Sequence, residues 1–527
     1  MTRTYEDPTR CAEAIIDQVG RDLVLAIPVG IGKPNLLVNA LYALAEADRR
    51  LSLRILTGLT LVRPKYRSDL ERRFAGPFVE RLFGSWPDLA YAEAMRRGKL
   101  APNVTVHEFF LQAGQWLSNP TMQQNYASLN YSHVHTHVQR EGVNVIAQLV
   151  APPRDGASYY SLSSNTDVSL DLKDYIEARR KSGAPIAVVG EVNANLPFMG
   201  GAAAVPRDSF DHIHEPPAPH FDLFAPPKEP VSITDYAMAL HAATLIKDGG
   251  TLQIGIGSFA DALTHALILR HTQNARFREL VGRLGEPPAA GAEYEPFQQG
   301  LYGCSEMLVD GFLALRRAGI LKRRVDDAGR SVLVHAGFFL GSSAFYDELR
   351  SLPDDARDEI AMTSISFTNT LAGDAAAKIT QRRDARFINT ALAATLLGAV
   401  SSDQTEDGRV ISGIGGQGDL LPWRMTFPMR ARSSRCAARA HRGAGRPPIS
   451  IGVTAIRVFR ASSETSSLPS TASPIFAAER TRKSSRRCWR SPMRAFSRSC
   501  GSPPWLPESC LRISSSHPMR RTIRPHG

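Results

Sequence analysis

Short runs of apolar residues, each followed by a turn, recur through the first half of the chain. Residues 23–29 form one such run, the turn Gly30-Ile31-Gly32-Lys33-Pro34-Asn35 follows, and apolar residues at helical spacing continue over residues 36–44. Similar runs occupy residues 143–149 and 185–191, and the second of them leads into Asn193-Ala194-Asn195-Leu196-Pro197. Buried strands that alternate with helices predict α/β units on a mostly parallel sheet.

The second half repeats this pattern after a break. Residues 215–230 contain six prolines and no apolar periodicity, which predicts a domain linker. A helix is expected over residues 232–247, followed by a strand at 251–254 and the turn Gly255-Ile256-Gly257. Further strands are expected at 331–335 and 360–365, and a helix at 389–397. The fold class that follows is α/β, with two open domains in tandem over residues 1–225 and 226–420.

The charge of the chain changes sign at about residue 420. Residues 1–420 hold 48 acidic and 42 basic residues, whereas residues 421–527 hold 20 Arg and one Lys against three Glu. Arg, Ser and Pro make up 51 of the 107 residues of this tail, and no apolar periodicity persists in it. Because such a segment cannot bury a core, we expect a disordered basic tail. Binding of nucleic acid is one function open to it, since basic arms neutralise phosphates.

A second explanation of the tail is translation out of frame. When the third base of each codon is paired with the first two bases of the next, residues 470–478 permit the string YGIADLRG and residues 421–434 permit AMAHDLPDARSIL. Both strings have the acids and the apolar spacing that a globular domain needs and that the written tail lacks. We therefore hypothesise a frameshift at about Leu420, in a GC-rich gene whose shifted codons favour Arg, Ser, Pro and Ala.

The first candidate site is the glycine turn Gly255-Ile256-Gly257-Ser258-Phe259-Ala260. It satisfies the dinucleotide fingerprint GxGxxA, in which the glycines let the backbone approach a pyrophosphate at a helix N-terminus. The acid required about 20 residues further on would be Glu279, which lies in a segment typical of a helix or loop rather than a strand end. NAD binding stays open, but we favour a backbone cradle for another ligand.

Two further segments could carry chemistry. Glu306 lies in the small and apolar stretch Gly303-Cys304-Ser305-Glu306-Met307, where it is either an acid at a helix N-terminus or a carboxylate nucleophile for an activated acyl group. The cluster Ser412-Gly413-Ile414-Gly415-Gly416-Gln417-Gly418-Asp419 has four glycines in six positions. It is either a plain loop or a backbone that points N–H groups at an oxyanion.

No metal site is predicted. The alternating residues His133-Val134-His135-Thr136-His137 would place three imidazoles on one face of a strand, but no Asp, Glu or Cys flanks them at ligand spacing. A polar strand face is the preferred interpretation. Cys11 and Cys304 are the only cysteines before residue 421. The N-terminus has acids and no apolar core, and no run is long enough to span a membrane, so we expect a cytoplasmic protein with no membrane contact.

Taken in order, these segments resemble the acetyl-CoA hydrolase/transferase family of class I CoA-transferases, and the chain is similar to 4-hydroxybutyrate/acetate/succinate CoA-transferases. The stretches that carry the resemblance are residues 190–197, residues 245–257, Ser305-Glu306-Met307 with Asp310-Gly311, and residues 412–417. The resemblance covers most of residues 15–420. The strings recovered from the shifted tail also look like the C-terminal continuation of this family. The motifs before residue 420 and the shifted tail therefore point independently to the same family.

The resemblance implies a mechanism and its residues. Glu306 would attack an acyl-CoA thioester and pass through a mixed anhydride to a glutamyl-CoA thioester, which an acceptor carboxylate opens. Gly255, Ile256 and Gly257 would face CoA, Gly415, Gly416 and Gln417 would hold the oxyanion, and Asn193 would line the acyl site. If water opens the thioester, the same site is an acyl-CoA hydrolase.

Cofactor and partners follow from the same resemblance. Coenzyme A would be a substrate with no permanently bound cofactor, and the partners would be an acyl-CoA and a small carboxylate, with no nucleic acid. An intact version would form a homo-oligomer, as a dimer. The resemblance makes residues 1–225 an N-terminal CoA-transferase/hydrolase domain and residues 226–420 an incomplete C-terminal one that carries Glu306. Because strands of that domain are missing, we expect the written polypeptide to be poorly folded or inactive. A nucleic-acid-binding protein and an NAD-linked oxidoreductase are the alternatives of another class.

The frameshift hypothesis predicts a defined change in the gene. Resequencing the DNA across the codons for Asp419 to Pro422 should reveal a one-base insertion or deletion that restores the second string above. An intact and confirmed reading frame would contradict the hypothesis.

Overall fold

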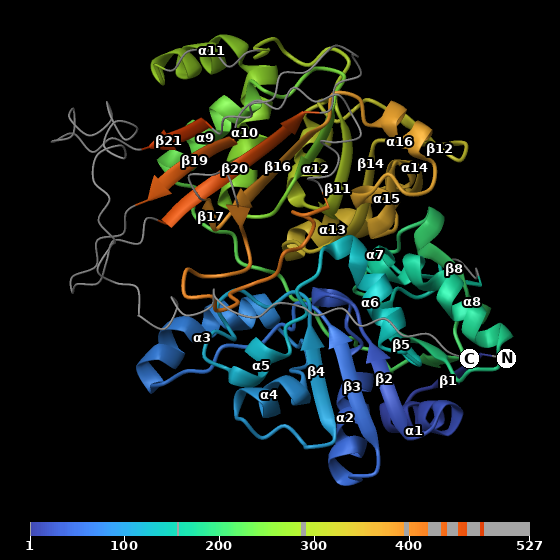
Figure 1. The fold of residues 1–527 in the computed structure, drawn as a ribbon. Coiled ribbons are helices and arrows are strands. Elements are labelled where there is room, and N and C mark those ends of the chain that lie inside the picture. The colour runs from blue at the N-terminus through green and yellow to red at the C-terminus, as the bar shows by residue number, and fades with distance from the viewer. Residues whose placement is uncertain are drawn as a thin grey trace, which may run out of the picture. The chain divides into compact units, whose positions relative to one another are not determined.

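The first half of the chain forms one parallel sheet. The computed structural model describes residues 2–154, 158–285, 291–394 and 400–419, and the strands at 434–439, 452–460 and 475–478. The sheet has the strand order β1-β9-β7-β5-β2-β3-β4, and every neighbouring pair is parallel. Its strands are β1 (Arg3–Tyr5), β2 (Asp22–Ala26), β3 (Ser52–Thr57), β4 (Val104–Glu108), β5 (Val145–Val150), β7 (Ala187–Val192) and β9 (His212–His214) (Figure 1). This confirms the expected parallel α/β architecture.

Helices connect these strands, as parallel pairing requires. Residues 30–32 form a short 3₁₀ turn before α2, where the sequence predicts a glycine turn. The helices are α1 (Pro8–Val19), α2 (Asn35–Ala47), α3 (Asp69–Phe83), α4 (Ala90–Arg96), α5 (Pro120–Gln124), α6 (Val134–Arg140), α7 (Thr166–Ser169) and α8 (Lys173–Lys181). The short strands β6 (Tyr159–Ser161) and β8 (Ala204–Pro206) pair beside them.

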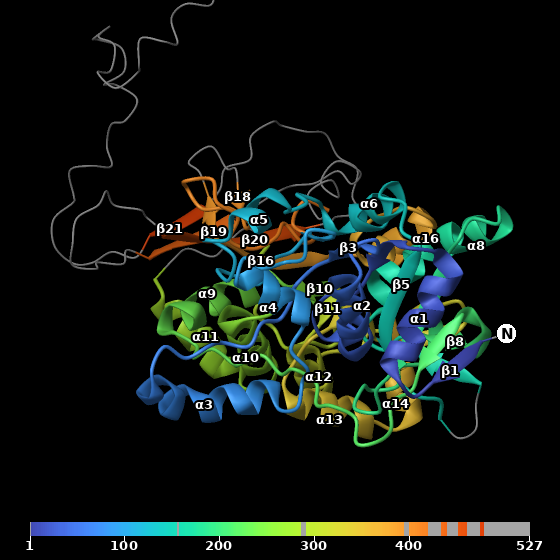
Figure 2. The same cartoon turned by 90° about the horizontal axis from the view of Figure 1, so that it is seen from below.

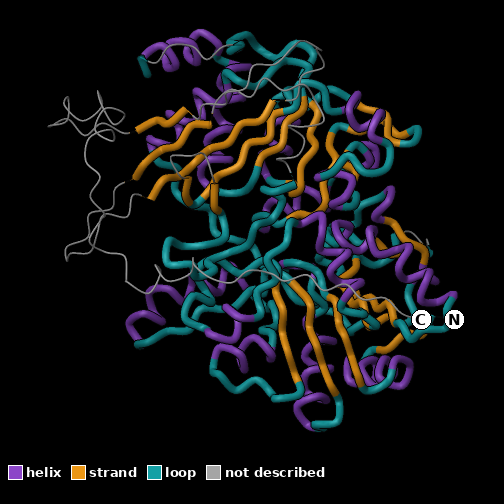
Figure 3. The backbone as a smooth tube through the Cα atoms, viewed as in Figure 1, coloured by secondary structure: helices purple, strands orange, loops and turns teal. Residues whose placement is uncertain are grey.

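The second half builds another sheet, which is parallel over its first five strands. The order is β15-β14-β11-β10-β16-β20-β19-β21. The parallel strands are β10 (Thr251–Ile254), β11 (Tyr302–Leu308), β14 (Val334–Phe339), β15 (Ile360–Met362) and β16 (Arg386–Ala391). Figure 3 shows the strands of each sheet side by side, flanked by helices.

Helices of the second half pack against this sheet. Figure 2 shows α9, α10 and α11 together on one side of β16, β20 and β19. The helices are α9 (Ile233–Ala243), α10 (Ser258–Thr272), α11 (Asn274–Arg283), α12 (Asp310–Arg317), α13 (Ser343–Ser351), α14 (Asp354–Asp358), α15 (Ile365–Asn369) and α16 (Ala375–Gln381). The short strands β12 (Val325–Asp327) and β13 (Arg330–Val332), and β17 (Ala393–Ala394) and β18 (Val400–Ser401), form two antiparallel pairs.

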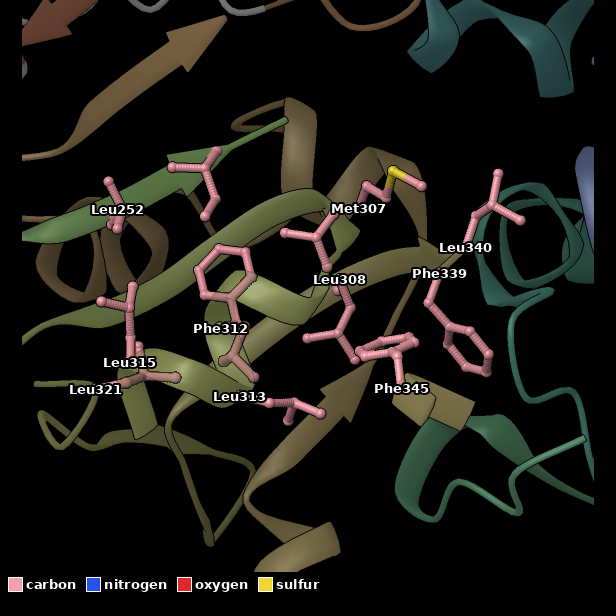
Figure 4. Close-up of a cluster of buried hydrophobic side chains, with 14 of the residues drawn as sticks. Leu252, Met307, Leu308, Phe312, Leu313, Leu315, Leu321, Phe339, Leu340 and Phe345 are labelled. Carbon is pink, nitrogen blue, oxygen red and sulfur yellow. The ribbon is translucent and has the colours of Figure 1, made fainter. Parts of the chain in front are cut away.

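A buried apolar cluster joins strand β11 to the helices that follow it. Met307 and Leu308 of β11 belong to this cluster, as do Phe312 and Leu315 of α12. In Figure 4 the side chains of Leu308 and Phe345 lie close together, whereas that of Met307 points to the other side of β11. Since β11 is fixed by this packing, the position of any polar side chain on the strand is fixed with it.

The structure corrects the helix that the sequence predicts at 389–397. Residues 386–391 form strand β16 instead, and β16 pairs in parallel with β10 through Leu252↔Arg386 and Ile254↔Ile388. A short run of apolar and small residues fits a helix or a buried strand equally well. The open edge of β10 decides between them, because a strand there satisfies the backbone groups of both partners.

The tail contains regular structure where the sequence predicts none. Strands β19 (Ser434–Arg439), β20 (Gly452–Arg460) and β21 (Ile475–Ala478) join the second sheet, and β20 pairs antiparallel with β16. The β20 sequence is rich in residues that favour strands, including Val453, Ile456 and Val458, and β16 offers it an edge. The disorder expected for residues 421–433, 440–451, 461–474 and 479–527 lies outside the described residues. The frameshift and the domain boundaries stay predictions.

The histidine cluster also differs from expectation. His133 ends a 3₁₀ turn and His135 and His137 lie in helix α6, not on a strand. Residues two apart on a helix point about 200° apart, so the three imidazoles do not share a face. Among the described helices, none has the length and apolar character needed to cross a membrane.

Candidate active site

The predicted site residues of the second half meet at the carboxyl edge of its sheet. Strands β10 and β11 are parallel neighbours, so the turn Gly255-Ile256-Gly257 after β10 lies beside the end of β11, which carries Glu306. Gly257 has φ of +114°, which lets the chain turn directly into α10. Ligands of open α/β sheets bind at this edge. Glu306 is therefore a strand residue, and the alternative of a helix N-terminus is wrong.

The glycine cluster passes over Glu306 at contact distance. A Cβ on Gly416 would lie 1.9 Å from Oε2 of Glu306, and one on Gly413 would lie 2.5 Å from the ring of Phe110. Gly415 has φ of +57°, a conformation that other residues rarely adopt. The glycines are required because the chain runs between a carboxylate and an aromatic ring with no space for side chains.

The first half of the chain holds this cluster in place. Gly413 forms an isolated antiparallel bridge with Phe110, and the backbone N–H of Tyr131 donates to the carbonyl of Gly415 at 3.0 Å. Asp419 accepts hydrogen bonds from the backbone N–H of Ser132, at 3.0 Å, and from its hydroxyl. The site is thus composed of segments more than 280 residues apart in the sequence.

Asn369 is a site residue that the sequence analysis missed. It ends helix α15, and its amide Nδ2 donates to Oε2 of Glu306 at 2.8 Å and to Oδ2 of Asp419 at 3.1 Å. One amide therefore connects the two carboxylates. No motif surrounds Asn369, so only its position in space reveals this role.

Burial gives Glu306 an unusual acidity. Burial, with a smaller contribution from the negative charges of Asp419 and Asp167, raises the pKa of Glu306 to about 7. The hydrogen bonds from Asn369 and from the backbone N–H of Gly416 oppose this shift because they stabilise the ionised form. Near neutral pH the carboxylate is consequently available, but it is less stabilised than one in water.

A cavity of about 490 Å³ opens above Glu306. Of the predicted site residues, Glu306, Gly255, Ile256, Gly415, Gly416 and Gln417 line it. Gly257 lies instead in an adjoining hollow of about 270 Å³ that shares Gly255 and Ile256. The side-chain amide of Gln417 bonds to the segment that begins at Val400: it accepts from the hydroxyl of Ser402 and donates to the carbonyl of Val400 at 3.3 Å.

Asn193 is not brought to this cavity. Its side chain is buried, donates to the carbonyl of Phe221 at 3.0 Å and accepts from the backbone N–H of Asn195 at 2.8 Å. These bonds fix the turn after β7 and the start of the linker. The structure therefore gives Asn193 a local structural role in place of the predicted contact with substrate. Within the described residues, no group of three or more His, Cys, Asp or Glu side chains is arranged to hold a metal ion.

Similarity to known proteins supports the resemblance. Residues 341–433 match the model of the acetyl-CoA hydrolase/transferase C-terminal domain, a match that extends past Leu420 into the tail. The chain is 28% identical over 236 residues to the 4-hydroxybutyrate coenzyme A transferase of Clostridium kluyveri, which spans 44% of each protein. It is 24% identical over 402 residues to the succinyl-CoA:cyclohexane-1-carboxylate CoA transferase of Geobacter metallireducens, covering 75% of this chain and 72% of that protein.

Solved structures agree on the fold. RipA from Yersinia pestis superposes with a TM-score of 0.52 at 19% identity, covering 80% of this chain and 78% of RipA. A mutant of RipA superposes with a TM-score of 0.57 at 20% identity and covers 86% of each chain. At such identities the likeness concerns the architecture alone. The sequence and family-model matches confirm the resemblance to the acetyl-CoA hydrolase/transferase family: residues 341–433 match its C-terminal domain, and both relatives named above are CoA transferases.

Proposed function

We propose that the chain is an acyl-CoA:carboxylate CoA-transferase in which Glu306 is the nucleophile. The observation that carries the proposal is the Glu306 carboxylate at the base of a cavity, held by Asn369 and covered by the backbone of Gly416. The names of the two curated relatives support the reaction class, because both are CoA transferases although they are named for different carboxylates.

The proposed reaction begins with attack on the thioester. A carboxylate oxygen of Glu306 adds to the acyl carbonyl carbon, and the C–S bond breaks. CoA leaves as a thiolate, and an acyl-glutamyl anhydride remains on the enzyme. The thiolate then attacks the glutamyl carbonyl, which releases the acyl group as a free carboxylate and leaves a glutamyl-CoA thioester. An acceptor carboxylate reverses both steps and restores the Glu306 carboxylate, so no other reactant is consumed.

The surrounding groups suit this chemistry. Partial burial destabilises the ionised form of Glu306. The carboxylate therefore loses less stabilising solvation when it attacks a neutral thioester than a carboxylate in water would lose. Gly415 and Gly416 line the cavity with backbone that carries no side chain, so an oxyanion can approach it closely. If water replaces the acceptor carboxylate, the same intermediate gives acyl-CoA hydrolysis. Comparing turnover with and without added carboxylate separates the two.

The tail does not contribute the residues used in this proposal, since all of them precede Leu420. We therefore propose that a frameshift would lower the stability of the second sheet while leaving the nucleophile in the chain. The first half-reaction, formation of the covalent adduct, is the appropriate test for the polypeptide as written.

Replacing Glu306 by Gln should abolish the covalent adduct. The full chain incubated with an acyl-CoA should gain the mass of CoA less one water on the peptide that contains Glu306, because the released acyl carboxylate takes one glutamate oxygen; mass spectrometry after digestion measures this gain. The Glu306→Gln chain should gain none, because an amide is a poor nucleophile. Glu279→Gln, which changes an exposed acid of α11, is the matched control and should label normally. Labelling of another residue, or turnover by Glu306→Gln, would refute the assignment.

Adduct formation should depend on pH with an apparent pKa near 7. The reactive form is the carboxylate, and its pKa is raised to about 7, so the single-turnover rate should fall as the pH decreases through 7. A stopped reaction series between pH 5 and pH 9, followed by mass spectrometry, measures this. A rate that stays constant down to pH 5 would show that Glu306 is not the titrating group.

The raised pKa of Glu306 also makes stability depend on pH: the rate of adduct formation should rise with pH, whereas the free energy of unfolding should fall. Because the folded pKa exceeds the ordinary value of 4.5, the wild-type chain loses stability as the pH rises between these values. Glu306→Gln should therefore exceed wild type in free energy of unfolding by about 1–3 kcal/mol above pH 7 and not below pH 4. Urea unfolding at pH 4 and pH 8 provides this independent check.

Replacing Gly416 by Ala should disable the site. The added Cβ would lie 1.9 Å from Oε2 of Glu306 and 2.5 Å from Nδ2 of Asn369, so the carboxylate must move and lose its hydrogen bond. Misplacement of a reacting group by about 1 Å costs on the order of 100-fold in rate. The matched control is Gly282→Ala in helix α11, where a Cβ meets nothing within 4 Å. An adduct rate in Gly416→Ala equal to that of this control would contradict the geometry.

A further inference from the structure

One part of the cavity is built from apolar and aromatic side chains. Val29, Leu59 and Phe109 come from the first half, with Tyr131 between two aromatic neighbours. The ring of Tyr131 lies 5.4 Å from that of Phe109 and 5.8 Å from that of Phe338. Its hydroxyl donates to the buried carboxylate of Asp167, so this polar atom is already satisfied within the protein. A ligand here meets hydrocarbon surface.

The described lining contains no positive charge. Glu306 is the only carboxylate among the described lining residues, and none of them is Lys, Arg or His. Lys33 is the buried cation behind the loops that carry Val29 and Leu59, but its ammonium donates to the carbonyls of Pro28, at 2.7 Å, and Leu59, at 3.2 Å, as well as to Gly58. It holds those loops and does not line the cavity.

A second carboxylate on the acyl group would therefore be unfavourable. It would lose its hydration without gaining a cationic partner, and it would add to the charges of Glu306 and the nearby Asp419 and Asp167. An uncharged hydrocarbon group has no such cost and gains from burial against the aromatic rings.

Polar lining groups come from other elements. Gln253 of β10 and Asn389 of β16 bond to each other through their amides at 3.0 Å, and both line the cavity. Amide groups suit the CoA arm of a thioester, which itself contains amides. The two kinds of lining thus match the two parts of an acyl-CoA.

The size of the cavity points to an acyl group larger than acetyl. An apolar cavity of about 150 Å³ already accommodates benzene. The cavity here measures about 490 Å³, of which the CoA arm needs only a part.

We propose that the acyl group accepted at Glu306 is uncharged, apolar and larger than acetyl, selected by Val29, Leu59, Phe109, Tyr131 and Phe338. This inference rests on the proposed function, because it assumes that the cavity takes an acyl-CoA. The class excludes acyl groups with a second carboxylate.

Two measurements on the full chain test the proposal separately from the reaction. The Glu306→Gln chain, which cannot form the adduct, is titrated by calorimetry with isovaleryl-, benzoyl-, acetyl- and succinyl-CoA. The first two should bind at least tenfold more tightly than succinyl-CoA and more tightly than acetyl-CoA. In the wild-type chain the rates of adduct formation should follow the same order.

A size variant links the preference to the apolar wall. Leu59→Trp should lower the ratio of benzoyl-CoA to acetyl-CoA reactivity at least tenfold, because the indole occupies the space of the larger acyl group. Ile233→Trp, at an exposed position of α9 with 89% of the side chain accessible, should leave the ratio as in wild type.

The outcomes test the substrate class and the proposed reaction separately. Equal or tighter binding of succinyl-CoA by Glu306→Gln, or an unchanged ratio in Leu59→Trp, would overturn the substrate class while leaving the nucleophile in place. Failure of all four thioesters to label Glu306 in the wild-type chain, despite binding in the expected order, would overturn the proposed function alone. Failure of all four to bind would overturn both.

Discussion

The site depends on one close approach, that of a side-chain-free backbone to a partly buried carboxylate. Gly416 lies where any Cβ would overlap Oε2 of Glu306, and a Cβ on Gly413 would lie 2.5 Å from the ring of Phe110. Such contact leaves no space for a side chain or a water molecule between the backbone and the carboxylate. Only glycine fits at positions 413 and 416, because any side chain there would overlap Phe110 or Glu306. The four glycines in the cluster are explained by packing before any chemistry is considered.

This contact also joins the two halves of the chain. The segment of residues 400–419 leaves the second sheet and packs on the loops that follow β4, through Gly413 and Phe110, Gly415 and Tyr131, and Asp419 and Ser132. Glu306 comes from the second sheet, whereas the apolar wall of the cavity comes mainly from loops of the first half of the chain. Neither sheet contains a complete site. The buried polar contacts between them fix the register at which they meet.

The sequence predicts the parts of this structure that depend on local pattern. The strand, glycine turn and helix at residues 251–272 are of this kind, since the apolar run and the glycines leave few alternatives. Residues 386–391 are not, because a short apolar run forms a strand only when an open edge such as that of β10 is available. Glu306 was found from its chemical type and neighbours. Asn369 was not, because its role comes from a contact across 63 residues with no motif.

The hydrogen bonds between Ser132 and Asp419 have a consequence for the order of events during synthesis. They link residues 287 positions apart, so the ribosome must complete nearly the whole globular part before they can form. The first sheet ends at His214 and can collapse on the nascent chain long before that point. The site is therefore completed late, when residue 419 emerges, and an interruption of translation upstream would release a chain in which the contact between Ser132 and Asp419 is missing.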